Sequence, residues 1–203
     1  MTERDLDIIE TLACRVRVMT LSQIANLWCE GDVADTLEHL NQLALTGAIE
    51  HTKTYSQYEK RSECVFRWTP TDQEPSFEQI VESRFAGQRT HNIAGDIYTA
   101  TRFAANLFAS EFTEFPSPEE RPEQLRLSDA YVAHCSSRST EASFWFNCRA
   151  GEPDTSNQTK PEVFIVDTEA SPTRAVSLLS RSVQRFKATH RYCQHEGISY
   201  ELW

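Results

Sequence analysis

Residues 20–47 read TLSQIANLWCEGDVADTLEHLNQLALTG and contain the start and stop signals of two consecutive helices. Thr20 and Gln23 have the spacing of a capping box, in which each side chain bonds the backbone of the other residue. Asp32 is a good N-cap for a second helix, and Gly47 is a typical residue to end it. Apolar residues recur along this second helix at steps of four, three and four: Val33, Leu37, Leu40 and Ala44. We therefore predict a short helix followed by a longer helix that buries these side chains.

The flanking sequence places this helix pair inside a larger motif. Upstream, apolar residues recur at helical spacing: Leu6, Ile9 and Leu12. Downstream, residues 48–55 and 64–69 are two β-prone runs on either side of a polar segment, 56–62. Helix, short helix, helix and hairpin is the order of a winged helix-turn-helix. We assign residues 1–70 to such a domain.

A second domain is expected after a short linker. Residues 69–76, TPTDQEPS, contain two prolines and no periodicity, so we place the linker at 71–76 and the second domain at 77–203. Its pattern predicts, in order, a mostly helical region over 77–112 with a break near Gly87, strands over 125–133 and 143–148, a buried strand over Val163–Val166, a helix from Pro172 and a strand over 198–202. This succession predicts an α/β core and, with the first domain, an α+β chain.

The composition restricts the class of protein. The chain has 203 residues, a net charge of −10 and a mean hydropathy of −0.51, and it has no apolar run long enough to cross a membrane. Its first residues lack the basic and apolar regions of a secretory signal, and its six cysteines include no CxxC pair. We therefore expect a cytoplasmic protein without membrane contact. The net charge also excludes a protein that coats nucleic acid indiscriminately, so any DNA contact must be local.

Three carboxylates have positions from which they could share a ligand. Asp129 falls within the strand predicted over 125–133, while Asp167 and Glu169 follow the buried strand. Because side chains alternate along a strand, Asp167 and Glu169 point the same way. Carboxylate oxygens are the ligands that Mg²⁺ and Mn²⁺ prefer, and such a metal polarises phosphate esters. All three residues are therefore candidate metal ligands and catalytic residues, with a merely polar strand end as the alternative.

The same residues resemble a known nuclease family. Ser128-Asp129-Ala130, a hairpin, residues 164–171 (FIVDTEAS) and a helix resemble the PD-(D/E)xK nuclease-like core, in which an Asp on one strand and a (D/E)xK or ExE pattern on the next hold the metal. With the winged helix and with His91 on a predicted helix, they resemble the replication-relaxation proteins, which include the MobC-type relaxases of mobilisable plasmids. The resemblance implies a restriction-endonuclease-like fold, Mg²⁺ or Mn²⁺ as cofactor, and DNA cut or bound at a plasmid transfer origin during mobilisation, conjugation or replication.

Two positions depart from the family's pattern. Ser128 stands in place of the motif's proline and Ser171 in place of its lysine, which leaves Arg174 as the nearest cation. An arginine can neutralise charge on a phosphate, but its high pKa prevents it from acting as a general base. Arg174 is therefore a candidate catalytic residue, and two functions stay open. One is a metal-dependent nicking endonuclease of the relaxase type; the other is an inactive adaptor or regulator of the same fold that binds DNA or protein.

Positive charge is concentrated in two places. Residues 172–191 carry five basic and no acidic residues, and we expect Arg181 and Arg185 in this predicted basic helix to contact phosphates. The wing offers three more candidates for DNA binding: Lys53, Lys60 and Arg61. The third predicted helix, which would read DNA in a winged helix, has acidic residues but no lysine or arginine. Three interpretations stay open: the wing contacts DNA, the domain docks a relaxosome protein or a second copy, or the wing acts together with the basic helix.

Overall fold

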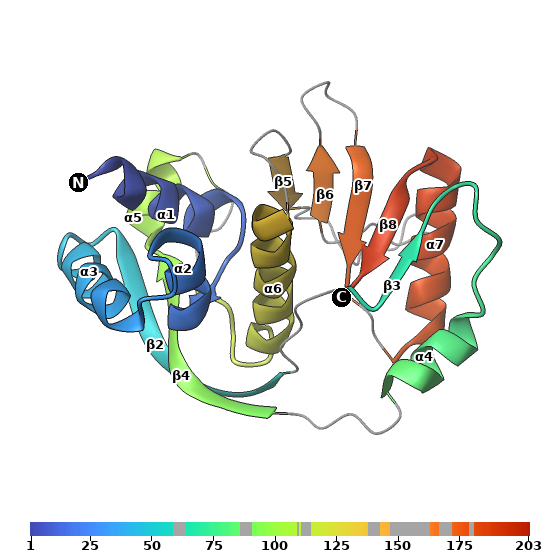
Figure 1. Ribbon diagram of the computed structural model, residues 1–203, viewed down its shortest axis with the longest axis horizontal. Helices are drawn as coiled ribbons and strands as arrows, with labels where there is room; N and C mark the ends of the chain where they lie inside the picture. The colour runs from blue at the N-terminus through green and yellow to red at the C-terminus, as the bar shows by residue number, and fades with distance from the viewer. Residues whose placement is uncertain are drawn as a thin grey trace. The chain divides into compact units, whose positions relative to one another are not determined.

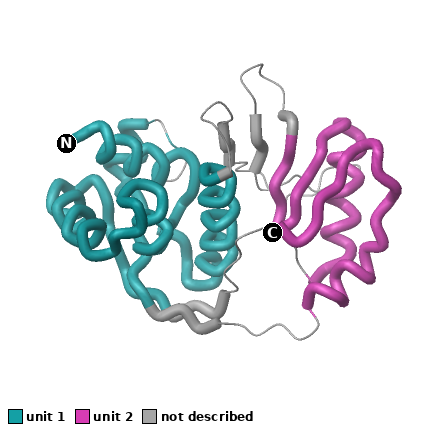
Figure 2. The backbone as a smooth tube through the Cα atoms, in the orientation of Figure 1, with its two compact units in different colours: residues 1–60, 90–138 teal, residues 61–89, 139–203 magenta. Residues whose placement is uncertain are grey.

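The computed structural model describes residues 1–58, 64–85, 91–108, 110, 115–137, 143–146, 163–166, 172–178 and 181–203 (Figure 1). The chain is of the α+β class, with helices and two separate sheets. It forms two compact units, each made of two stretches of chain. Unit 1 contains residues 1–60 and 90–138, and unit 2 contains residues 61–89 and 139–203 (Figure 2). Among the described residues, no helix has the length and apolar content needed to cross a membrane.

Unit 1 begins with three helices. Its elements in chain order are α1 (Glu3–Cys14), β1 (Met19–Thr20), α2 (Leu21–Trp28), α3 (Val33–Leu45), β2 (Ile49–Tyr58), β4 (His91–Ala100), α5 (Arg102–Leu107) and α6 (Arg121–Ser137). Thr20 and Gln23 form the predicted capping box at α2, and the Asp32 side chain accepts hydrogen bonds from backbone N–H groups in the first turn of α3. Gly47 follows α3 with φ +75°, a conformation that favours glycine. The predicted starts of α2 and α3 are thus confirmed.

The face that α3 buries differs from the prediction. Val33 and Leu37 are 46% and 38% exposed, although we expected both to be buried. The buried stripe instead contains Thr36, Leu40 and Leu43. Thr36 can lie in the interior because its hydroxyl donates a hydrogen bond to the backbone carbonyl of Asp32. The buried stripe of α3 therefore includes the short polar side chain of Thr36, whereas the sequence pattern predicts the apolar Leu37 there.

The sheet of unit 1 has the strand order β1-β4-β2, with antiparallel neighbours. β2 pairs with β4 along its whole length, from Ile49 opposite Ala100 to Tyr58 opposite His91. Residues 59–90 therefore lie in sequence between the two strands of one hairpin.

Two predictions for this region are wrong. Residues 64–69 do not form the second strand of the hairpin, because β3 (Phe66–Trp68) pairs with a strand of unit 2. The region predicted as mostly helical over 77–112, with a break near Gly87, begins with α4 but continues as the strand β4, so that His91 begins a strand instead of lying on a helix. In β4 the side chain of Ile97 becomes fully buried, and burial of this kind outweighs the local helical pattern.

Unit 2 is built on a five-stranded sheet with the order β3-β8-β7-β6-β5. After β3, its elements are α4 (Phe77–Phe85), β5 (Ser143–Phe146), β6 (Val163–Val166), β7 (Pro172–Ser177), α7 (Val183–Glu196) and β8 (Ser199–Leu202). Neighbouring strands are antiparallel except β7 and β8, which are parallel and joined through α7. The core lies between the sheet and the helices α4 and α7, where Trp68 and Tyr200 pack with Phe77 and Phe186.

Two predicted elements of the second domain have a different structure. The strand predicted over 125–133 is wrong, because these residues belong to α6 in unit 1. Leu125 and Leu127 are both buried there, and the Ser128 hydroxyl donates to the Val18 carbonyl, so α6 is covered on more than one side. A helix buried in this way has no single apolar stripe, and its apolar spacing can imitate that of a strand.

The helix predicted from Pro172 is also wrong in its first part. Residues 172–177 form β7, and α7 starts only at Val183, where the Ser182 side chain accepts a hydrogen bond from the backbone N–H of Arg185. The units also differ from the predicted domains 1–70 and 77–203. Residues 71–76, the predicted linker, lie within unit 2 between β3 and α4.

Candidate functional site

Two arginines flank a buried glutamate on three neighbouring strands of unit 2. Arg67 on β3 lies directly opposite Glu201 on β8, and its Nε is 3.3 Å from Glu201 Oε1. Arg174 on β7 reaches the same oxygen from the other side, with Nη1 at 2.7 Å. The second carboxylate oxygen accepts a hydrogen bond from the indole N–H of Trp203 at 3.2 Å. We call Arg67, Arg174 and Glu201 the arginine–glutamate cluster.

The cluster lies on the sheet face opposite to the aromatic core. Trp68 and Tyr200, the strand neighbours of Arg67 and Glu201, stack on each other with ring centroids 5.5 Å apart in the core beneath α4 and α7. Because side chains alternate along a strand, Arg67 and Glu201 point to the other face. The sheet therefore separates an apolar face from a charged one.

The charges of the cluster favour an anion. Two guanidinium groups and one carboxylate sum to a charge of +1, and solvent screens the pair of Glu201 with the 20% exposed Arg174 more weakly than its pair with Arg67. The Arg67 side chain is 69% exposed, so its guanidinium is accessible to solvent. Guanidinium groups match the geometry of phosphate oxygens, and Glu201 holds both in position. The cluster can therefore orient a phosphate at its exposed edge.

The cysteine beside Arg67 is a poor nucleophile. The Arg67 Nε lies 3.0 Å from the Cys64 sulfur. Burial raises the pKa of the Cys64 thiol, the nearby Glu201 raises it further, and Arg67 offsets only part of this increase. Cys64 therefore stays a neutral thiol at neutral pH. Because the thiolate is the reactive form of cysteine, Cys64 is a poor nucleophile.

An open hollow lies beside the cluster, between β3, the segment before α4, and α4 itself. Its volume is about 690 Å³, and both Phe66 and Arg67 contribute to its lining. The remaining lining is mostly polar and includes Asp72, Gln73 and Gln79. An aromatic ring, a guanidinium and side-chain amides are the groups that nucleic acids contact through base stacking, phosphate binding and hydrogen bonding.

The predicted metal ligands do not form one described group. Asp129 lies on α6 of unit 1 and is 4% exposed, and its carboxylate accepts a hydrogen bond from Gln23 Nε2 at 2.7 Å. This bond connects α2 with α6. Asp167 and Glu169 lie outside the described residues; in sequence, Asp167 directly follows β6 and Glu169 precedes β7. The described part of the chain contains no group of three His, Cys, Asp or Glu side chains arranged to hold a metal ion. The Mg²⁺ or Mn²⁺ site thus stays a prediction.

The predicted DNA-binding residues have varied surroundings. Lys53 is exposed on β2, opposite Asp96 of β4, whereas Lys60 and Arg61 lie outside the described residues. The Arg181 guanidinium lies over the Phe85 ring at 5.3 Å from its centroid. Arg185 is half-buried in the first turn of α7. The single basic helix that we expected is therefore divided, with Arg174 on β7 and the other four basic residues on or just before α7.

Arg67 and Glu201 were missed by reasoning from the sequence. Each stands between apolar residues in a short strand, as in Phe66-Arg67-Trp68. This alternation indicates a charged sheet face, but not which strands are neighbours, and that pairing is what brings Arg67, Glu201 and Arg174 together. Comparisons with protein-family models, curated proteins and solved structures give no match.

Proposed function

We propose that the chain is a DNA-processing protein of plasmid mobilisation or replication, with a winged helix in unit 1 and a PD-(D/E)xK nuclease-like core in unit 2. The observation that carries the proposal is the order of elements in unit 2. Three antiparallel strands, β5, β6 and β7, are followed by α7 and by β8, which is parallel to β7. The predicted core also has the order strand, strand, strand, helix, strand, but its segments differ, because residues 125–133 form α6 and residues 172–177 add β7 before the helix.

The topology of unit 1 supports the winged helix. α1, β1, α2, α3, β2 and β4 follow the order of that domain, and the sheet order β1-β4-β2 brings the short first strand next to the last one. The connection between β2 and β4, which would be the wing, carries the 32 residues 59–90, including β3 and α4. The predicted DNA contacts Lys53, Lys60 and Arg61 would then belong to the wing and its base.

The strand order favours two of the three predicted carboxylates as metal ligands. Asp167 follows β6, and Glu169 precedes β7, the antiparallel neighbour of β6. In the resemblance to the nuclease core, both residues belong to the (D/E)xK or ExE pattern after the buried strand, and Asp129 is the carboxylate on the other strand. Asp129 fits this role less well because it lies on a helix and is bonded to Gln23. We therefore propose that Asp167 and Glu169 would hold Mg²⁺ or Mn²⁺, which would neutralise charge on the scissile phosphate.

In the proposed function, the arginine–glutamate cluster binds the DNA backbone. Glu201 orients Arg67 and Arg174, so that their guanidinium groups need little reorganisation when a phosphate arrives. Neither arginine can accept a proton, because both stay charged at all physiological pH values. The cluster would thus stabilise charge, and proton transfer would fall to water or to another group.

The adaptor is a second candidate function, favoured by a specific observation. Arg174 is the nearest cation to the position where the family has its lysine, and it forms a 2.7 Å ion pair with Glu201. With Asp129 also bonded to Gln23, two of the four predicted catalytic residues have structural partners. A protein of this fold that binds DNA or protein without cutting would retain both contacts.

Nicking of a supercoiled plasmid tests the endonuclease. With Mg²⁺ or Mn²⁺ we expect the wild type to produce open circles, and Asp167→Asn and Glu169→Gln to lower the rate at least about 100-fold, the size of effect typical of removing a group that stabilises transition-state charge. Glu82→Gln is the matched control, because Glu82 is an exposed carboxylate on α4 of the same unit. If the wild type leaves the plasmid intact with both metals, the endonuclease is rejected in favour of the adaptor.

Binding of a fluorescent DNA duplex tests the phosphate contact independently of cleavage. Arg67→Gln should weaken binding about 5-fold and reduce the slope of affinity against salt by about one counterion. Arg84→Gln, which removes an exposed arginine of α4, should change neither. Equal affinities of all three proteins would exclude the cluster from the DNA interface.

A further inference from the structure

We propose that the exposed face of α3 docks a basic amphipathic helix of a partner protein. Three large apolar side chains of α3 are open to solvent: Val33, Leu37 and Leu45, at 46%, 38% and 81% exposure. Leu40 and Leu43 are buried and anchor the helix, and Val33 and Leu37 flank this packed side. The exposed apolar residues are thus additional to those that hold α3 in unit 1.

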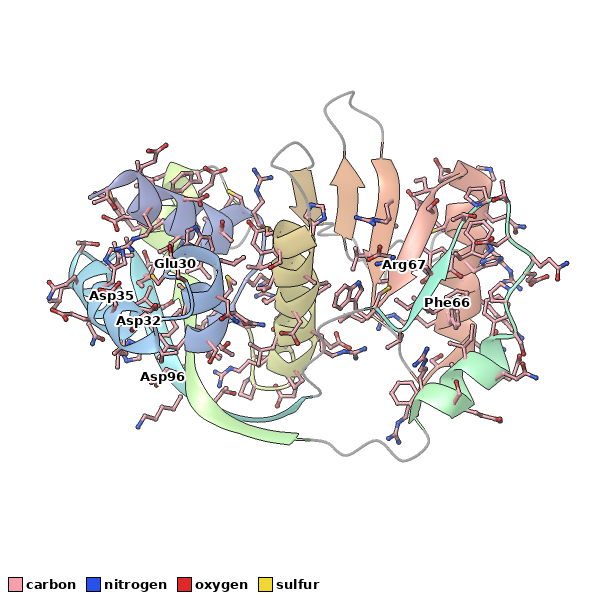
Figure 3. The ribbon with its side chains drawn as sticks, in the orientation of Figure 1. Glu30, Asp32, Asp35, Phe66, Arg67 and Asp96 are labelled. Atoms are coloured by element: carbon pink, nitrogen blue, oxygen red, sulfur yellow. The ribbon has the colours of Figure 1, made fainter. Side chains whose placement is uncertain are left out.

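Acidic side chains border the exposed apolar residues of α3. Asp35 and Glu38 are exposed on the helix, and Glu30 lies in the turn before it. Figure 3 shows Glu30, Asp32 and Asp35 gathered where α2 leads into α3. The sequence of α3, VADTLEHLNQLAL, contains no lysine or arginine. Its only other ionisable residue, His39, is turned toward Asp5 of α1, with 2.7 Å between Nε2 and Oδ1. The exposed charged side chains of α3 itself are therefore all negative.

This combination selects the chemistry of the partner. The DNA backbone is densely negative, so an acidic helix would be repelled from the groove that a winged helix usually enters. An amphipathic helix with a basic edge complements both features. Its apolar stripe would cover Val33, Leu37 and Leu45, and its lysines or arginines would meet Asp35 and Glu38.

The face is also held rigidly, which lowers the entropic cost of docking. Asp32 caps the start of α3 through hydrogen bonds to two backbone N–H groups, 2.9 and 3.0 Å long. Gly47 ends the helix, and the contact between His39 and Asp5 connects α3 to α1. The proposed docking face goes beyond the proposed function and does not depend on nuclease activity, because its residues all belong to unit 1 and none is a predicted metal or DNA ligand.

The experiment uses the full chain and a synthetic peptide of leucine and lysine arranged with helical periodicity. By isothermal titration calorimetry we expect saturable binding, with little binding of the same peptide carrying glutamate for lysine or of a shuffled peptide that cannot form an amphipathic helix. Asp35→Lys/Glu38→Lys should weaken binding at least 10-fold, and Leu37→Ser/Leu45→Ser should weaken it similarly. Circular dichroism checks that each variant is folded.

Glu119→Lys/Glu123→Lys is the matched control, because it makes the same charge change at exposed positions of unit 1 outside α3. It should retain the affinity of the wild type. Equal losses in the two charge-reversed variants, or equal binding of the shuffled peptide, would show attraction by net charge alone and overturn the proposal. Light scattering adds a second test: a dimer that Leu37→Ser/Leu45→Ser converts to a monomer would assign the face to a second copy and overturn the proposal. None of these measurements contains DNA or metal, so their outcome is separate from that of the nicking assay.

Discussion

At the scale of single residues, Glu201 is a buried charge in the sheet of unit 2. It is 5% exposed and accepts hydrogen bonds or ion pairs from Arg67, Arg174 and Trp203. Replacing it by glutamine would remove a counter-charge from the guanidinium of Arg174, whose side chain is only 20% exposed. Breaking a buried ion pair from one side is strongly destabilising.

We therefore predict that Glu201→Gln lowers the free energy of unfolding by about 3 kcal/mol in urea denaturation. The matched control is Glu78→Gln, because Glu78 also forms a 2.8 Å ion pair, with Lys187, but is 59% exposed. Exposed pairs contribute little, so the control should keep its denaturation midpoint. A Glu201→Gln variant as stable as the control would show that the cluster does not stabilise unit 2 through its charges.

His190 gives unit 2 a predicted sensitivity to acid. It is 1% exposed, its Nδ1 lies 3.1 Å from the Tyr200 hydroxyl, and aromatic rings surround it. Burial lowers the pKa of His190 below its ordinary value of 6.5, Arg191 lowers it further, and Glu74 opposes the shift. Below pH 6.5 the unfolded chain therefore binds a proton that the folded chain does not, and stability falls as the pH falls.

The measurement is urea denaturation at several pH values between 5 and 8. In the wild type the free energy of unfolding should decrease from pH 7 to pH 5, and His190→Gln should remove part of this decrease even if it is less stable at every pH. His195→Gln, which replaces a histidine with a 72% exposed side chain at the end of the same helix, should keep the pH dependence of the wild type. Parallel curves for the wild type and His190→Gln would contradict the prediction.

The sequence identified some of these residues but not their neighbours. Arg174 was a candidate because it follows the acidic segment, and its contact with Glu201 was not foreseen. Pairing across strands depends on register, and register follows from the burial of whole faces rather than from any local pattern. The contact between Asp129 and Gln23 was missed for a similar reason. The sequence identifies Gln23 only as a member of a capping box, and no local pattern connects it with Asp129.

At the scale of secondary structure, helix ends were predicted better than strand pairs. The N-caps Thr20 and Asp32 are local signals, since each side chain bonds a backbone group two or three residues away. The hairpin of β2 and β4 joins residues separated by the whole of β3 and α4, and no local signal reports such a distance. The strand expected over 125–133 failed for a related reason, because α6 is too widely buried to show helical periodicity.

Gly197 offers a test at this scale. It follows α7 with φ +67°, and its backbone N–H bonds the carbonyls of the last helical turn. No atom lies within 4 Å of the position that a Cβ would take, so the effect of Gly197→Ala is purely conformational. We predict a loss of about 1 kcal/mol, measured by thermal unfolding.

Gly95 is the control for this substitution. It lies in β4 without a positive φ, and a Cβ there would also meet no atom within 4 Å. Gly95→Ala should be neutral or slightly stabilising, because alanine restricts the unfolded chain without strain. Equal effects at the two glycines would mean that the left-handed conformation at the end of α7 is not what requires glycine.

At the scale of the whole molecule, the interleaving of the two units has a consequence for their folding. Unit 1 needs β4, which follows 32 residues after β2 in the chain, to complete its sheet. The predicted domain 1–70 lacks β4, and with it the fully buried Ile97 and Tyr98, whose burial contributes about 2 kcal/mol each. We predict that a fragment of residues 1–70 has no cooperative thermal transition by circular dichroism.

A second fragment provides the positive arm of this experiment. Tyr58 and His91 are directly opposite each other in the hairpin, so an Asn-Gly turn can replace residues 59–90 and join residues 1–58 to 91–137. This fragment contains every element of unit 1 and should unfold cooperatively, because β2, β4 and the helices that cover them are all present. A cooperative transition in 1–70 together with none in the joined fragment would contradict the division into two interleaved units. A cooperative transition in the joined fragment, with none in residues 1–70, would show that residues 59–90 are an insertion that unit 1 does not need in order to fold.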